Sequence, residues 1–191
     1  MKHRISVGQY RAIDLSILTG VLIFSELLIC LAVSRWFPAQ LYVASPAAAV
    51  VTLVMMRWDA WAAVPALAGG IVYSLLYGGS AAQVAIYAVG NLAALLLVPV
   101  LRRVGKERVR GDAIYSLLLG LGVQLLMQGG RAVVALVLGF GTGAAIGFFT
   151  TDTLSILFTL VIVWIIRRVD GLFEDQMHYL LRIQDEEDEE K

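Results

Sequence analysis

The chain has a single cysteine, Cys30, and only two histidines, His3 and His178. One cysteine cannot form an internal disulfide, and two histidines near opposite ends of the chain do not form a His/Cys metal cluster. The sequence also lacks an HExxH pair, paired glutamates with a helical histidine, and a Walker phosphate loop. We therefore expect no enzymatic activity, no metal ion and no cofactor.

Charge is scarce as well. Only 16% of the residues are charged, 59% are hydrophobic, and the mean hydropathy is +0.79. This composition is typical of a polytopic membrane protein rather than of a soluble domain. The first apolar run is too long for a signal-peptide core and has no clear cleavage site, so we expect an uncleaved first span.

The apolar runs predict an all-α membrane protein with six transmembrane helices in a compact bundle. The second run is short and contains Pro46, and the polar residues 57–59 predict a tight turn after it. Residues 1–168 would form the transmembrane domain. Residues 169–191 would form a cytoplasmic amphipathic segment, with Phe173, Met177, Leu180 and Leu181 on one face, and an acidic tail at 185–190. The expected spans are approximately 15–33, 41–56, 60–77, 81–101, 114–138 and 152–166.

The basic residues predict the orientation of these spans. Thirteen of the fifteen Lys and Arg residues fall in the N-terminal segment, the loops at 57–59 and 102–112, and the C-terminal tail. Arg35 is the one on the opposite side, and Arg131 lies within a span. The positive-inside rule then places both termini in the cytoplasm. The same rule and anionic lipid account for the basic loop, so we expect no nucleic-acid partner.

The fifth span carries the most informative pattern. Gln124, Gln128 and Arg131 interrupt 25 apolar residues and fall on one narrow stripe of a helix. An arginine inside a membrane is costly and indicates a function together with a partner group. The alternative is an arginine that extends to the membrane surface, since Arg131 is only seven residues from the outer end of the span.

Other polar residues are expected at the same depth as Arg131, in the outer half of the membrane, where we predict a solute-binding pocket. Glu26 or Asp152 could pair with Arg131, and the pair could also be purely structural. Asp152 could instead cap the sixth helix, and the amides could simply join neighbouring helices. The glycine-rich segment 139–150 is expected to be a loop that covers the pocket. The remaining pocket candidates are Tyr73, Gln83, Tyr87 and Asn91.

The sequence ALAGGIVYSLLYGG (66–79) and the following IYAVGNLAALLLVPVLRR (86–103), with six spans and outer polar groups, resemble the S components of energy-coupling factor (ECF) transporters. The resemblance implies capture of a vitamin or similar small solute in a bacterial or archaeal cytoplasmic membrane. It also implies partners, a transmembrane T component and two ATPases that would hydrolyse the ATP. Family members carry a small-residue AxxxA-like patch on the first span for docking to the T component, for which Ser16 and Gly20 are the nearest match here.

Two other functions stay open at this point. A membrane scaffold of the MreD-like cell-shape type has a similar size and span count, and the C-terminal amphipathic segment and acidic tail would then bind its partners. An ion-coupled or proton-coupled carrier is the third possibility. The apolar inner halves of the spans disfavour a carrier, because a path across the membrane would place polar residues in both halves.

Overall fold

The computed structural model describes residues 6–39 and 44–180. Helices account for 84% of the structure, and no strand occurs among the described residues. The prediction of an all-α protein is therefore confirmed. Leu181 and the acidic run at 185–190, which the sequence analysis singled out, lie outside the described residues.

Five helical segments are long and apolar enough to cross a membrane, which indicates a multi-pass membrane protein. They comprise a single long helix, three segments made of consecutive shorter helices, and the helix that carries Arg131. The bounds of these segments are Val7–Trp36, Ala47–Leu76, Ala81–Val104, Ala113–Val137 and Thr142–Ile166.

The second segment, Ala47–Leu76, folds back on itself. Helix α2 (Ala47–Trp58) is followed by a 3₁₀ turn, η1 (Asp59–Ala62), and by α3 (Ala63–Leu76). The backbone reverses at Asp59, whose φ of 52° is the one positive value at a described non-glycine residue. As a result Ala47, at the start of α2, lies against Gly69, halfway along α3. The polar turn predicted at 57–59 is thus correct.

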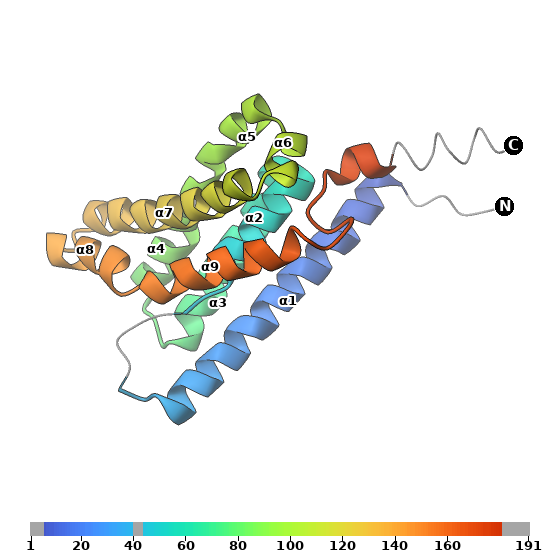
Figure 1. The fold of residues 1–191 in the computed structure, drawn as a ribbon. Coiled ribbons are helices and arrows are strands. Elements are labelled where there is room, and N and C mark those ends of the chain that lie inside the picture. The colour runs from blue at the N-terminus through green and yellow to red at the C-terminus, as the bar shows by residue number, and fades with distance from the viewer. Residues whose placement is uncertain (1–5, 40–43, 181–191) are drawn as a thin grey trace, which may run out of the picture.

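Helix α2 is the centre of the bundle. All but one of its twelve residues are buried, which explains why its sequence is apolar on every side rather than on one face. By contrast α1 (Val7–Trp36) lies along one edge (Figure 1), and only Leu15, Leu22 and Glu26 are buried. Helix α1 begins well before the expected residue 15, because Ser6 and Gln9 form a capping box at its start.

The fourth apolar run forms α4 (Ala81–Asn91), a 3₁₀ stretch η2 (Leu92–Leu97) and α5 (Val98–Val104), followed by the short α6 (Lys106–Gly111) in the basic loop. Glycines bring α4 close to its neighbours. A Cβ placed on Gly90 would lie 2.6 Å from the Cα of Arg131, so only glycine allows this approach of α4 to α7 (Ala113–Val137).

The glycine-rich segment was expected to be a loop, and this prediction is wrong. Residues Thr142–Thr150 form helix α8, which continues after a break at 151–152 into α9 (Thr153–Ile166). Helix α8 packs along the last turns of α7, and Phe148 contacts Tyr87 edge to face. The glycines were read as a sign of flexibility, but apolar contacts with α7 support a helix there.

The start of α1 and the C-terminal segment (Gly171–Leu180) lie together at one end of the bundle (Figure 1). We call this the basic end, and it also includes residues 57–59 and 102–111. Arg57 binds the Asp14 carboxylate through two nitrogens at 2.8 Å and donates to the carbonyls of Gly171 and Leu172. The C-terminal segment therefore packs on the transmembrane bundle, with Phe173 almost fully buried.

Candidate functional site

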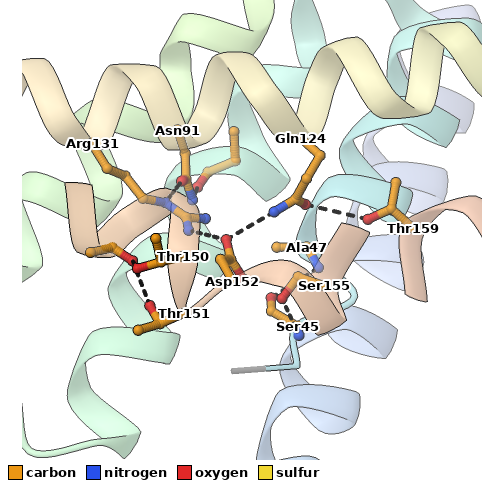
Figure 2. A network of polar contacts seen from close by, with 12 residues as sticks. Ser45, Ala47, Asn91, Gln124, Arg131, Thr150, Thr151, Asp152, Ser155 and Thr159 are labelled. Atoms are coloured by element: carbon orange, nitrogen blue, oxygen red, sulfur yellow. Dashed lines mark hydrogen bonds and ion pairs between the residues drawn. The ribbon is translucent and has the colours of Figure 1, made fainter. Parts of the chain in front are cut away.

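Arg131 of α7 lies in a polar cluster between helices (Figure 2). Its Nη1 is 3.0 Å from Oδ2 of Asp152, and its Nε donates to Oδ1 of Asn91 at 2.8 Å. Its guanidinium also lies 4.8 Å from the centre of the Tyr87 ring, a cation–π distance. Only 5% of Arg131 is exposed, so it is a buried residue with partners and does not extend to the membrane surface.

Asp152 is the centre of this cluster. It lies in the break between α8 and α9, where its Oδ2 accepts hydrogen bonds from both Arg131 and Gln124, the latter at 2.9 Å. Its side chain makes no capping bond to α9, so the capping alternative is wrong for the side chain. Gln124 accepts in turn from Thr159 of α9, seven residues or about two helical turns after Asp152. These bonds join α7 to the break and to α9.

Asn91 links the cluster to α3, because its Nδ2 donates to the carbonyl of Ala66 at 3.0 Å. The use of both ends of this amide fixes its orientation: the oxygen faces Arg131 and the nitrogen faces α3. Asn91 is buried, as are Gln124 and Gln128. The predicted stripes on the fourth and fifth spans therefore meet at Arg131.

Three tyrosines form a row beside Arg131. The ring of Tyr73 lies 4.9 Å from that of Tyr87 and 4.7 Å from that of Tyr77. Tyr73 belongs to α3, Tyr77 follows the last residue of α3, and Tyr87 belongs to α4, so the row joins the two helices. The row gives the cluster an aromatic wall of rings tilted by 36° from one to the next.

Glu26 is buried completely but does not pair with Arg131. Its Oε1 accepts a hydrogen bond from the hydroxyl of Ser45, which precedes α2, and the backbone nitrogen of Ser45 donates to Ser155. Of the two carboxylates considered for Arg131, the partner is thus Asp152. Ser45 connects Glu26 to the cluster, because it bonds to Glu26 of α1 and to Ser155 of α9.

Several buried polar atoms of this region have no hydrogen-bond partner among the described residues. They are Oε2 of Glu26, Oδ1 of Asp152, and both amide atoms of Gln128. Buried polar groups in folded proteins are mostly hydrogen-bonded, so these atoms keep bonding capacity that the described residues do not use.

One of the pocket candidates, Gln83, is not brought into the cluster. Gln83 caps the start of α4, where its Oε1 accepts from the backbone of Ser80 at 2.7 Å, and it is exposed. Its assignment to the pocket is therefore wrong; the spacing with Tyr87 and Asn91 matched, but a residue three positions after Ser80 completes a capping box. Ser16 and Gly20, the candidates for docking to a T component, are exposed on α1, and no atom outside α1 lies within 4 Å of the Cβ position of Gly20. Their docking role stays a prediction.

Ser45, Ser155 and Thr159 take part in these contacts but were not predicted from the sequence. A signal for the last two was present, because Asp152, Ser155 and Thr159 are three and four residues apart and so share one helix face. Ser45 gave no such signal, since it lies outside any helix and its role depends on the position of α1.

The cluster is closed in this structure. Ser45, Asn91, Arg131 and the glycines of α3 line a narrow space with Tyr73 and Tyr87, and this space does not admit a water molecule. Among the described residues, the outer-half pocket expected from the sequence is thus a set of side chains that converge on this narrow space. No family model, no curated protein and no solved structure matches this chain.

Proposed function

We propose that this protein is the solute-binding membrane subunit of an ATP-driven importer of the energy-coupling factor type. It would capture a vitamin or similar small solute with an anionic group from outside the cell, and partner subunits would supply the ATP hydrolysis. The observation that carries the proposal is the buried Arg131, bonded to Asp152 and Asn91 and facing Tyr87, within membrane-spanning helices.

A buried ion pair is an expensive way to hold helices together. Apolar residues of similar volume often stabilise a fold as well as or better than such a pair, so a pair indicates stability only weakly. The second oxygen of Asp152, Oδ1, has no hydrogen-bond partner among the described residues, and neither has the amide of Gln128 on the same face of α7 as Arg131. A binding site, in which these groups bond to one another without solute and to the solute when it is present, accounts for the buried ion pair and for the unpartnered polar atoms.

The contacts of Arg131 suggest what a solute would replace. A carboxylate or phosphate on the solute accepts the same N–H bonds that Asp152 and Asn91 accept in the closed structure. A flat ring could pack on the tyrosine row. Binding would then require α8 and the break at 151–152 to move away from α7, and the solute would favour the open conformation by its higher affinity for it.

The scaffold alternative is weaker because of the C-terminal segment. That alternative assigned the amphipathic segment and the acidic tail to binding partner proteins, and the tail lies outside the described residues. Phe173 of this face is 1% exposed and packs within the protein's own core, and Arg57 holds the backbone just before it.

The proposal includes six crossings, with α2 and α3 counted separately and both termini in the cytoplasm. It predicts that a reagent outside the cell modifies a cysteine placed at Ser80 and spares one at Lys106, in a variant that lacks Cys30. Ser80 is at the start of α4 and Lys106 is at the basic end, so they report on opposite ends of the bundle. The reverse labelling pattern would contradict the orientation and the outward-facing site.

The function itself is tested by melting curves of the purified protein in lipid nanodiscs with a panel of vitamins and related solutes. A compound present at 100 times its dissociation constant stabilises the protein by about 2.7 kcal/mol. We expect anionic solutes to raise the melting temperature. A panel in which no solute changes the melting temperature would contradict solute binding.

A further inference from the structure

A second cleft lies at the basic end, away from the cluster around Arg131. Its volume is about 400 Å³, and α1, the turn at 57–62, α5, α6 and the C-terminal segment all contribute to its walls. Its lining combines cations, two tryptophans and two carboxylates. The lining includes the cations Arg11, Arg102 and Lys106, the carboxylates Asp59 and Asp175, and Trp61.

The charges in this cleft are not balanced. Lys106 lies between Asp59 and Asp175, with its Nζ at 3.1 Å and 2.9 Å from their oxygens, and it neutralises one of them. Arg102 is 3.8 Å from Asp59 and 63% of its side chain is exposed. Arg11 has no carboxylate within ion-pair distance among the described residues. The cleft therefore keeps a positive charge at its rim.

The position of Arg11 is fixed by an aromatic ring. Its guanidinium lies 4.3 Å from the centre of the Trp61 ring, and Trp61 is 45% exposed. Tryptophan is enriched where the hydrocarbon of a membrane meets the headgroups. A guanidinium stacked on such a ring keeps its N–H donors free for an anion at headgroup level.

An exposed apolar strip leads away from this rim along α3. It consists of residues on one side of η1 and α3, each more than a third exposed, namely Trp61, Val64, Leu67, Ile71 and Leu75. In a membrane this strip faces hydrocarbon. A cationic rim at the headgroup level and an apolar strip that begins at the same tryptophan match the two parts of one phospholipid.

We propose that this cleft binds the headgroup of an anionic phospholipid, whose phosphate contacts Arg11 and Arg102 and whose acyl chain lies along α3. The headgroup must carry a net negative charge, because the ammonium group of a zwitterionic lipid would face the same two guanidiniums. This site is separate from the solute site and does not depend on the proposed function.

Native mass spectrometry of the protein with an equimolar mixture of phosphatidylglycerol and phosphatidylcholine tests the site. We expect the protein with one bound lipid to carry phosphatidylglycerol roughly ten to thirty times more often than phosphatidylcholine. Each basic residue near a headgroup contributes about 1 kcal/mol to this preference. The variant Arg11→Gln/Arg102→Gln should bind the two lipids almost equally, and each single variant should be intermediate.

The matched control is Arg35→Gln/Arg103→Gln, which removes the same charge from α1 and α5 but at residues that do not line the cleft. It should keep the preference of the unmodified protein. If the control and the test variant lost the preference for phosphatidylglycerol equally, the preference would come from the overall charge of the protein, and the proposed site would be wrong. Displacement of bound phosphatidylglycerol by about 10 mM inorganic phosphate would also overturn it, in favour of a soluble phosphate ligand. Melting curves confirm that each variant is folded.

Discussion

Replacement of Arg131 by glutamine tests what the buried ion pair does in the absence of any solute. The substitution removes the charge, the bond from Nη1 to Asp152 at 3.0 Å and the bond from Nε to Asn91 at 2.8 Å. It also removes the cation above the Tyr87 ring. Asp152, only 4% exposed, keeps Gln124 as its bonding partner among the described residues.

Removal of one member of a buried pair is destabilising by about 3–5 kcal/mol, mainly because the other charge stays buried without compensation. For a chain of this size each kcal/mol lowers the melting temperature by roughly 2–4 °C, so the expected decrease is roughly 6–20 °C. The exposed Arg35 of α1 provides the control, and Arg35→Gln should change the melting temperature by only a degree or two.

The second part of this prediction is a rescue. Asp152→Asn alone should also destabilise the protein, because it leaves the guanidinium unpaired. The double variant Arg131→Gln/Asp152→Asn removes both charges and should lose less stability than the sum of the two single losses, with a coupling energy of about 1–3 kcal/mol. The assay is a set of melting curves in nanodiscs without solute. A double variant whose loss of stability equals the sum of the two single losses would refute the reasoning, because the two residues would then act independently and not as a pair.

The remaining predictions concern helix contact and pH. Gly90→Ala should lower the melting temperature markedly, because the new Cβ would lie 2.6 Å from the Arg131 backbone, whereas Gly20→Ala, with no atom within 4 Å, should leave it unchanged or raise it slightly; equal effects would contradict the close contact of α4 and α7. Partial burial of Asp175 opposes its ionisation, but the hydrogen bond and charge of Lys106 outweigh it, and the pKa of Asp175 lies below its ordinary value of 3.8. The stabilisation that ionised Asp175 gives the folded protein is therefore complete above pH 3.8 and disappears as the pH falls through the lower pKa of Asp175 in the folded protein. The difference in melting temperature between the protein and Asp175→Asn should shrink on acidification below about pH 4, and a difference independent of pH would exclude this role.

The helical fold could be predicted because its signals are local. Runs such as 114–138 are long enough to span a membrane by themselves, and the structure places α7 within one residue of that range. The turn at Asp59 could be predicted as well, from two charged residues, Arg57 and Asp59, between apolar runs. The central place of α2 could not, because it depends on which helices surround it.

The candidate site was predictable where a helix carried its own polar stripe. Gln124 and Arg131 on α7, and Asn91 on α4, meet as their spacing indicated. Gln83 has the same spacing, but it lies in the first turn of α4 and caps the helix start, so it does not reach the cluster. Glu26 was expected in a pair or in the pocket, but its oxygen meets Ser45, which only the path of the chain into α2 brings close.

The central claim is that Arg131 and Asp152 form a solute site and not only a support for the fold. The most direct test measures the solute-induced shift in melting temperature for the double variant Arg131→Gln/Asp152→Asn, with the anionic compound that most stabilises the unmodified protein. Our account predicts a folded double variant that shows little or no shift, since binding loses charge-assisted bonds of about 1.5–3 kcal/mol, roughly ten- to a hundredfold in affinity. A double variant that melts normally and keeps the full shift would contradict the claim.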